Sequence, residues 1–349
     1  MAGLLGTRGS GGGAPPGRAL DRAGVLLVGV AVVWTLVTAA GQAGARPWPV
    51  VALLLGAAGL VVGTRHLAGR EPSLVPGAVA LAVTGSLVLG FPALFDAGGA
   101  PLGYANSNAT LAALGAVAAA AAAAVTRPSA ARRAWAGLAV LLVAGVAATG
   151  STAAALALGV AALLVLGSVL LEQLTLAVLG GAIAVALTLG VTVSIAGGAE
   201  PLDLHERAGL RADLWAGALD EAREAPLRGT GPGAYPHHLP IGVDADLRWA
   251  HHGYLQQAAE QGVVGLAWLL ALVGWAYLRL WVGRERAHAR TLAGAAAVTV
   301  VALHATVDHV LHEAAVPLTL AVLVGWATAD RPDGAGSAPR RPAGVEAAR

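Results

Sequence analysis

The amino-acid sequence predicts an all-α, polytopic helical membrane protein with about ten transmembrane helices and one large extracytoplasmic loop. Its composition supports this class, because 56% of the 349 residues are hydrophobic and only 12% are charged. Ordinary soluble domains carry roughly 25% charged residues. The apolar residues form long runs, and roughly 20 apolar residues are enough for a helix to cross a bilayer. The charged residues lie in the segments between those runs.

The apolar runs divide the chain into tails, spans and one long loop. We expect a disordered tail over residues 1–22, transmembrane helices over 23–196, an extracytoplasmic loop over 197–261, further spans over 262–329 and a second disordered tail over 330–349. The predicted spans lie at about 24–41, 48–64, 74–94, 108–125, 134–150, 152–171, 174–196, 262–282, 291–311 and 315–329.

The arginine residues predict the orientation of these spans. Cytoplasmic loops of membrane proteins carry an excess of basic residues. Only Arg46 lies in a short loop that we predict outside, so both termini are predicted in the cytoplasm. Ala43-Gly-Ala45 resembles a signal-peptidase site, but the tail before it is long for a signal peptide and favours a retained first span. The loops predicted inside hold Arg65, Arg70, Arg127, Arg132, Arg133, Arg284, Arg286 and Arg290.

Charge and cysteine content narrow the classes of function. A formal net charge of +2 gives no support to nucleic-acid binding. The chain has no Cys, which excludes disulfides and thiolate metal sites. Attention therefore falls on the loop at 197–261, because a loop of this length in a compact protein is usually functional.

This loop is predicted to contain an amphipathic helix at 204–223 whose apolar stripe could lie in the headgroup plane. After the helix comes Gly229-Thr-Gly-Pro-Gly233. Its backbone N–H groups could bind a phosphate, but it lacks the Lys-Ser/Thr of a P-loop, and a plain turn explains it equally. The apolar stripe consists of Leu210, Leu214, Trp215, Ala218 and Ala222.

Two adjacent histidines, His251 and His252, stand where the loop meets the next span. In a helix, His252, Gln256 and Glu260 would share one face. An imidazole can titrate near neutral pH and accept a proton from a sugar hydroxyl. The alternative is that these polar side chains only cap a span at the headgroup level.

Three arginines of the loop, Arg207, Arg211 and Arg248, could bind a diphosphate. A guanidinium forms paired hydrogen bonds to phosphate oxygens and keeps its charge in a poorly hydrated site. Salt bridges to the acidic residues of the loop, or contacts with lipid headgroups, are the alternative for each of them.

Polar residues at two other span ends are further candidates. His304, Asp308 and His312 recur every four residues in the predicted span 291–311 and could orient a catalytic group. They could also bind a metal, but no tight ligand set accompanies them, so no metal is predicted. Asn106 and Asn108 begin another span, where they could bind a sugar or cap the helix.

Several of these segments resemble the O-antigen ligase / Wzy polymerase family of bacterial membrane proteins. The family pattern of His, nine residues and Gly-x-x-Gly is matched by His251-His252, nine residues and Gly262-Val-Val-Gly265. Its Arg…Trp…Pro-x-x-Gly-x-Gly stretch is similar to Arg211 to Trp215 followed by Pro226-Leu-Arg-Gly229-Thr-Gly231. The chain departs from the family at Thr152, where Arg is common.

The resemblance implies a metal- and cofactor-independent glycosyltransferase in the bacterial cytoplasmic membrane, with its active site facing outside. The donor would be a polyprenyl-diphosphate-linked glycan and the acceptor an envelope glycan or lipid. His251 and Arg211 would be the catalytic pair. The substrate would be bound by Arg207, Arg248, His252, Gln256, Glu260, Asn106, Asn108, His304 and Asp308. A transporter or flippase, or a non-catalytic family member, remains the alternative, because polar residues in spans also line transport paths.

Overall fold

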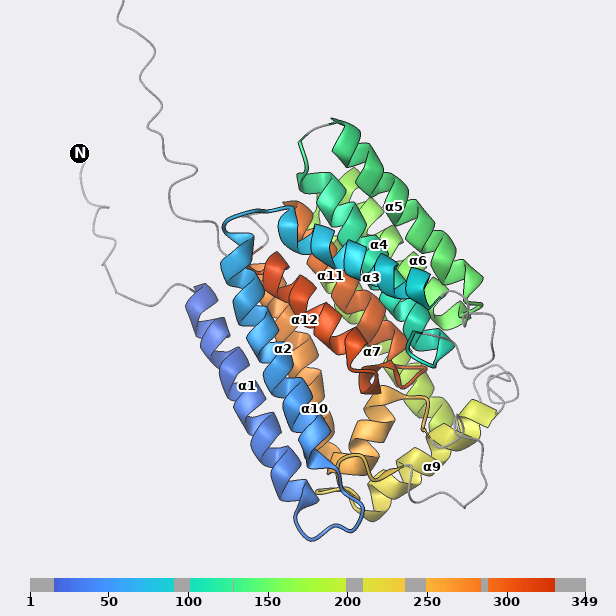
Figure 1. The fold of residues 1–349 in the computed structure, drawn as a ribbon. Helices are drawn as coiled ribbons and strands as arrows, with labels where there is room; N and C mark the ends of the chain where they lie inside the picture. The colour runs from blue at the N-terminus through green and yellow to red at the C-terminus, as the bar shows by residue number, and fades with distance from the viewer. Residues whose placement is uncertain are drawn as a thin grey trace, which may run out of the picture.

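The computed structural model describes residues 16–90, 101–127, 129–198, 210–235, 249–283 and 288–329. Within these ranges the chain is helical and forms no strand, which confirms the predicted all-α class (Figure 1). The elements are α1 (Pro16–Ala39), α2 (Pro47–Ala68), α3 (Leu74–Leu89), α4 (Ala105–Val125), α5 (Ser129–Ala148), α6 (Thr152–Leu170), α7 (Leu174–Ala196), α9 (Leu210–Glu224), α10 (Gly253–Gly283), α11 (His288–His304), a short 3-10 helix η5 (Val310–His312) and α12 (Ala315–Ala327).

Each of the ten predicted spans coincides with one of these helices. Seven of the described helices are long and apolar enough to cross a membrane, namely α1, α2, α4, α5, α6, α7 and α10. Helices α3 and α12 are apolar but shorter. The predicted span 291–311 is wrong at its end, because α11 stops at His304 and the chain then turns through residues 305–314. Asp308 therefore lies in a turn, and His312 is the last residue of the short 3-10 helix η5, so neither belongs to α11.

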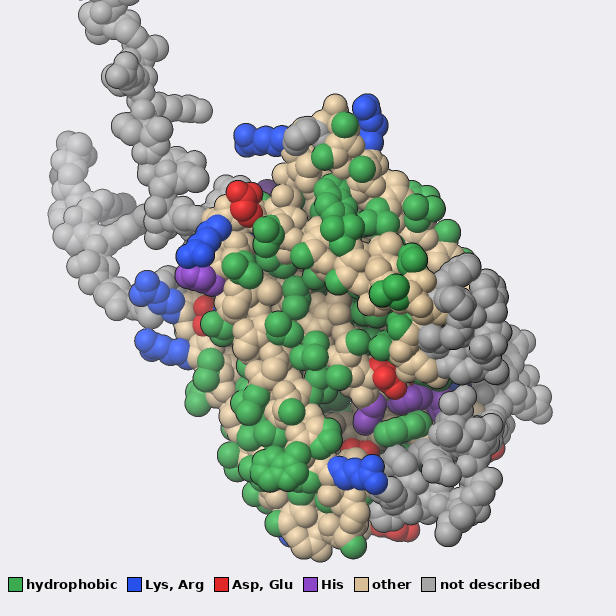
Figure 2. Space-filling view, in the orientation of Figure 1, with side chains coloured by type: hydrophobic (Ala, Val, Ile, Leu, Met, Phe, Trp, Pro, Cys, Tyr) green, Lys and Arg blue, Asp and Glu red, His purple; other side chains and the backbone are tan. Residues whose placement is uncertain are grey.

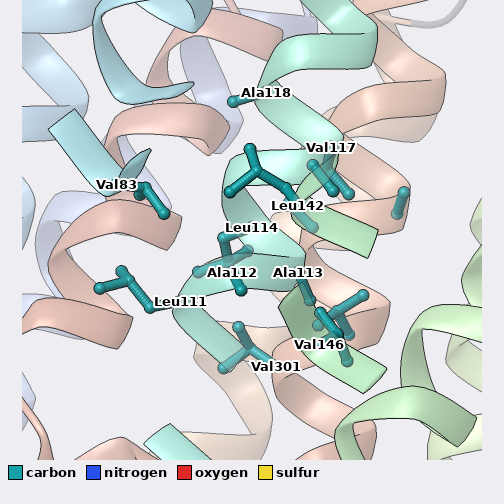
Figure 3. Packing of buried hydrophobic residues seen from close by; sticks show 14 of the residues in the cluster. Val83, Leu111, Ala112, Ala113, Leu114, Val117, Ala118, Leu142, Val146 and Val301 are labelled. Carbon is teal, nitrogen blue, oxygen red and sulfur yellow. The ribbon is translucent and has the colours of Figure 1, made fainter. Parts of the chain in front are cut away.

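The interior of the bundle is built around α4 and α11. Helix α11 packs against α4, α6, α7 and α12, and α4 packs against α3, α5 and α11. In the most apolar 18-residue stretch of α4, 78% of the residues are buried inside the protein, compared with 11% in the corresponding stretches of α2 and α5. The alanines of α4 permit this close approach of neighbouring helices. Figure 3 shows Leu114 and Val117 of α4 among Val83, Leu142 and Val301 of the helices around it.

Helix α1 is attached to the bundle at both ends. Asp21 Oδ1 lies 2.7 Å from Arg65 Nη1 and 3.0 Å from Arg279 Nε. At the other end, Trp34 Nε1 donates to the carbonyl oxygen of Gln261 at 2.9 Å. The prediction of a tail over residues 1–22 is therefore wrong from residue 16 onward, because these ion pairs hold the first turns of α1 against α2 and α10. Residues 1–15 and 330–349 lie outside the described part of the chain. These contacts also favour a retained first span.

Helix α9 crosses the end of the bundle opposite to the start of α1 (Figure 1). It begins at Leu210, and residues 204–209 of the predicted amphipathic helix lie outside the described ranges. Trp215 and Ala218 of the predicted stripe are buried in a protein cluster with Tyr235, Leu255 and Ala259. The expectation that this stripe faces lipid headgroups is therefore wrong, because protein side chains already cover it.

Helix α10 consists of two helical parts joined at Gly262, where φ is +69°. The loop at 226–233 is inserted at this break. Val263 N donates to the Pro226 carbonyl at 2.8 Å, and Thr230 N donates to the Ala259 carbonyl at 2.9 Å. The first part of α10 is thereby turned away from the direction of the long apolar part, and it carries the polar residues of the predicted motif.

Candidate active site

Asp308 is the centre of a polar cluster at this end of the bundle. Its side chain is fully buried. Asp308 Oδ2 accepts hydrogen bonds from the Tyr104 hydroxyl at 2.7 Å and from Asn106 Nδ2 at 2.5 Å. The same oxygen lies 3.5 Å from Arg211 Nη2 and 3.9 Å from His251 Nδ1. The structure therefore brings the two predicted catalytic residues, His251 and Arg211, to one carboxylate.

His251 lies directly before α10 and has a left-handed backbone, with φ of +49°. Among the described residues, only Glu172 shares this property without being glycine. The Tyr104 hydroxyl lies 3.2 Å from His251 Nδ1. Because that hydroxyl donates its proton to Asp308, the network assigns the Nδ1 proton to His251 as the donor toward Tyr104. In this tautomer, His251 Nε2 carries the lone pair that can accept a proton.

Arg211 reaches the cluster from the first turn of α9. Its Nη1 donates to the Val307 carbonyl at 3.2 Å, and its side chain remains 39% exposed. The guanidinium is thus held at the edge of the cluster with one face toward protein and part of its surface accessible. Such a group can contact an anion while it stays oriented by Asp308 and the Val307 carbonyl.

The electrostatics of the cluster keep Asp308 charged. Burial alone would raise the pKa of Asp308, but the imidazoles of His251 and His309, whose Nδ1 atoms lie 3.9 and 3.3 Å from the carboxylate oxygens, hold this pKa well below its usual range. The pKa of Tyr104 is raised, first by burial and then by the Asp308 charge. Tyr104 therefore remains a protonated donor and Asp308 an ionised acceptor throughout the neutral pH range.

Aromatic rings surround the cluster on one side. His309 is stacked between Tyr104, at 4.6 Å between centroids, and Trp249, at 5.3 Å. His312 lies 5.0 Å from the Trp249 ring. Burial lowers the pKa of His309, although Asp308 opposes this shift. The sequence does not predict Tyr104, His309 or Trp249 as site residues, because only tertiary contacts distinguish them from interface anchors: Tyr104 and His309 contact Asp308, and Trp249 stacks on His309.

The cluster also contains a geometric candidate for a metal site. One ligand atom each from His251, Asp308 and His309 lies within 4.8 Å of the others. The carboxylate of Asp308, however, already accepts from Tyr104 and Asn106. The positive guanidinium of Arg211 lies beside the same oxygen and would repel a cation. The residues present therefore fit an anion beside Arg211 better than a metal ion.

Three predicted substrate contacts have structural partners instead. His252 is fully buried, accepts from Leu255 N through Nδ1 at 3.2 Å and lies 2.9 Å from Thr192 Oγ1 through Nε2. Burial lowers the pKa of His252 to about 3, so the ring is neutral. Both ring nitrogens are thus engaged by protein in the wall of the bundle, and the contact of His252 with substrate stays a prediction.

Gln256 and Glu260 form a chain that leads away from the cluster. Gln256 Nε2 donates to Glu260 Oε1 at 3.0 Å and lies 3.0 Å from His312 Nε2. Glu260 Oε2 accepts from Gly233 N at 2.8 Å. Both side chains are buried. The structure thus places them as supports between α10 and the loop at 226–233, and not at an exposed binding surface.

The backbone of the loop at 226–233 is also engaged. Thr230 N, Gly231 N and Gly233 N donate to the Ala259 carbonyl, the Glu260 carbonyl and the Glu260 carboxylate. These donors are consumed within the protein, so the possibility that this segment binds a phosphate is not supported. The alternative interpretation, a structural turn, explains it.

The remaining predicted residues have hydrogen-bond partners other than Asp308 or lie outside the described ranges. Asn108 Oδ1 accepts from Leu102 N at 3.2 Å and fixes the segment before α4. His304 Nδ1 lies 2.6 Å from Thr110 Oγ1, inside the bundle. Arg207 and Arg248 fall on residues that the structure does not describe.

The sequence departs from the family pattern at Thr152, which is at the start of α6. Ser151 caps this helix by accepting from Ala154 N at 3.3 Å, and Thr152 is its first residue. Among the described residues, no hydrogen bond or ion pair joins Thr152 to Asp308. The arginine that is common in the family would thus stand at the start of α6. In the described part of the chain, Arg211 is the arginine that lies beside Asp308.

Comparison with known proteins agrees with this geometry. No curated protein matches the chain in a sequence search. Residues 137–270 match the family model described as O-antigen ligase (Wzy_C). The matched range includes α9, Arg211, the loop at 226–233 and His251, which are the segments that carry the resemblance in the sequence. Over these residues the chain is similar to the O-antigen ligase family of membrane proteins.

Proposed function

We propose that the protein transfers a glycan from a polyprenyl-diphosphate donor to a hydroxyl group of an envelope glycan or lipid. In this reaction the acceptor oxygen attacks the anomeric carbon of the donor sugar, and the bond from that carbon to the phosphate oxygen breaks. The acceptor proton passes to His251, and the electron pair stays on the departing polyprenyl diphosphate.

The observation that carries the proposal is the convergence of His251 and Arg211 on Asp308. Asp308 and Tyr104 hold the imidazole with its Nδ1 proton toward them, which leaves Nε2 as the basic nitrogen for an acceptor hydroxyl. Arg211 is partly exposed beside this imidazole and can stabilise the negative charge that develops on the diphosphate.

The location of the cluster supports a lipid-linked donor. Asp308 and α9 lie at one end of a bundle whose candidate spans are apolar and lipid-compatible. We propose that this end faces outside, as the arginine distribution predicts. The donor headgroup would then lie beside Arg211 while its polyprenyl chain stays in the bilayer.

The proposal is tested with purified protein in lipid nanodiscs and a polyprenyl-diphosphate-linked glycan. We expect His251→Ala to lower kcat by roughly 10²-fold or more, because a positioned general base contributes at least that much. Arg211→Lys should also be slow, because an ammonium group cannot reproduce the two-pronged guanidinium contact. Arg223→Lys, on the exposed face of the same helix, is the matched control and should retain wild-type turnover.

Wild-type turnover by both His251→Ala and Arg211→Ala would contradict the assigned roles. Movement of the lipid-linked glycan across vesicle membranes, without a covalent product, would support the transporter alternative in place of this proposal.

A further inference from the structure

Trp215 of α9 contacts His251 through a single directed hydrogen bond. The indole Nε1 of Trp215 donates to the His251 carbonyl oxygen at 3.0 Å, and the Trp215 side chain is 4% exposed. The Trp215 ring also stands edge-on to His252, with 5.6 Å between the ring centroids. Helix α9 thus carries both Arg211, which lies beside Asp308, and Trp215, whose indole binds the His251 carbonyl.

The His251 carbonyl needs such a partner because the backbone there is unusual. A φ of +49° brings the Cβ of an L-residue close to its own carbonyl, so residues other than glycine rarely adopt it. Such conformations persist where surrounding contacts determine them, and they cluster at functional sites. A more common backbone conformation would turn the carbonyl away from Trp215 and the imidazole away from Asp308.

The backbone of Gly253, which follows His251 and His252, is also held in place. Gly253 N lies 2.8 Å from the Ala305 carbonyl and 3.0 Å from the Asp308 carbonyl. A Cβ at Gly253 would lie 3.3 Å from the Ala305 carbonyl oxygen, so this backbone approaches the 305–308 turn closely. The His251 backbone is therefore clamped on one side by the 305–308 turn and on the other by Trp215.

We propose that Trp215 is a positioning residue for glycosyl transfer, whose indole N–H keeps the His251 backbone left-handed and thereby holds the imidazole at Asp308. The inference rests on the proposed function, since it assumes that His251 acts in the reaction. It explains why a tryptophan, with a hydrogen-bond donor on a large apolar ring, occupies this position of α9. A phenylalanine would fill most of the same space but could not hold the carbonyl.

The test compares three substitutions in the full-length protein in nanodiscs. Trp215→Phe removes the N–H to His251. Tyr235→Phe removes another anchor of α9, the hydroxyl that donates to the Leu214 carbonyl at 3.3 Å, without touching His251. Trp268→Phe removes a buried indole N–H of α10 that has no hydrogen-bond partner among the described residues. The measured quantities are kcat, the KM for the donor, and the rate at which diethyl pyrocarbonate modifies His251, followed by mass spectrometry.

We expect Trp215→Phe to lower kcat about tenfold, the effect of one lost hydrogen bond, with donor KM changed by less than about twofold. Its His251 should react several times faster with diethyl pyrocarbonate, since the imidazole leaves a site where its side chain is 8% exposed. Tyr235→Phe and Trp268→Phe should match wild type in all three measurements. The reactivity measurement needs no turnover, so it decides the matter even for a variant with little activity.

Two results overturn the inference. One is wild-type kcat and wild-type His251 reactivity in Trp215→Phe. The other is an equal loss in Tyr235→Phe, which would mean that any loosening of α9 has the same effect. If His251→Ala is slow while Trp215→Phe is normal, only this inference fails. If His251→Ala is itself normal, the proposed function fails first.

Discussion

At the scale of single residues, Asp308 organises the candidate site. It is a fully buried carboxylate, and its partners come from α4, from α9 and from the residue before α10. A buried charge of this kind is retained only where partners compensate its lost hydration. The hydrogen bonds that compensate it also orient the imidazole and the guanidinium, so the stability of the charge and the geometry of the site depend on the same contacts.

Replacing this carboxylate by an amide should disable the site without unfolding the protein. In Asp308→Asn the side chain keeps its size, but it loses the charge that faces Arg211 and His251. We expect kcat to fall by roughly 10²-fold or more, measured as glycan transfer in nanodiscs. Asp220→Asn, which breaks an exposed pair with Arg223, is the control and should be neutral. Near-wild-type kcat in Asp308→Asn would show that the carboxylate is dispensable.

Asp308 should not titrate in the pH range where activity is measured. Its pKa lies well below the usual range of a carboxyl group, because His251 and His309 stabilise the charged form despite burial. A loss of activity between about pH 5 and 7 would therefore have to come from another group.

A second carboxyl, that of Glu221 in α9, should make stability depend on pH. Its pKa is raised to about 7, first by burial and then by the charges of Glu224 and Glu260. In the unfolded chain the same group titrates near 4.5. Folding therefore takes up a proton between these values, and stability falls as pH rises from about 4.5 to about 7. Above about pH 7 the buried Glu221 carboxylate is charged, and it lowers the stability of the folded protein by its full amount.

Glu221→Gln should remove this dependence. We expect it to be more stable than wild type at pH 8 by on the order of 1 kcal/mol, a value reduced for the partial exposure of the group, and nearly equal at pH 4.5. Thermal unfolding in detergent at both pH values measures the difference. Glu71→Gln, which removes an exposed carboxyl between α2 and α3, serves as control. A gain that is the same at both pH values would argue against the protonation explanation.

At the scale of elements, the junction between α10 and the loop at 226–233 positions the first part of α10. A Cβ at Gly262 would lie 2.2 Å from the Leu227 carbonyl oxygen, and a Cβ at Gly229 would lie 2.3 Å from the Glu260 carbonyl carbon. Both glycines have positive φ. The glycine-rich loop at 226–233 and the Gly262-Val-Val-Gly265 segment thus pack against each other, and each needs its glycine to allow this close approach.

Gly262→Ala should therefore be strongly destabilising. The new methyl group meets backbone atoms that cannot move independently, and the required φ is unfavourable for alanine. We expect a loss of ~2 kcal/mol or more, seen as a lower unfolding temperature in detergent. Gly274→Ala in the same helix is the matched control, since a Cβ there meets nothing within 4 Å. Equal unfolding temperatures for the two variants would mean that the junction can relax.

At the scale of the whole molecule, the polar side chains separate toward the two ends of the bundle. Figure 2 shows apolar side chains scattered over this face and most of the basic groups toward the end where the N-terminal trace leaves; a patch of histidine lies in the lower half, near a further basic group, and histidine also lies beside the basic groups at the upper left. We propose that the end with the basic groups is cytoplasmic, because cytoplasmic loops carry the arginines. The candidate site then faces outside, where a lipid-linked glycan would meet its acceptor.

This orientation can be measured directly because the chain contains no cysteine. Single cysteines at Ala43, between α1 and α2, and at Glu71, between α2 and α3, report on opposite ends of α2. We expect a membrane-impermeant maleimide to label Ala43→Cys in intact cells and Glu71→Cys only after permeabilisation. The reverse pattern would invert the proposed topology and place the site in the cytoplasm.

The sequence alone determined the helical class, the approximate positions of the spans and the residue types of the candidate site. These properties depend on the length of apolar runs and on motifs within one segment, which are local. Tertiary structure decided which polar residues meet. Tyr104 and Asp308 are separated by 204 residues in the chain, and Tyr104 and His251 by 147. It also engages His252 Nε2 with Thr192 and the glycine-rich loop with Ala259 and Glu260, partners distant in sequence that no local pattern records.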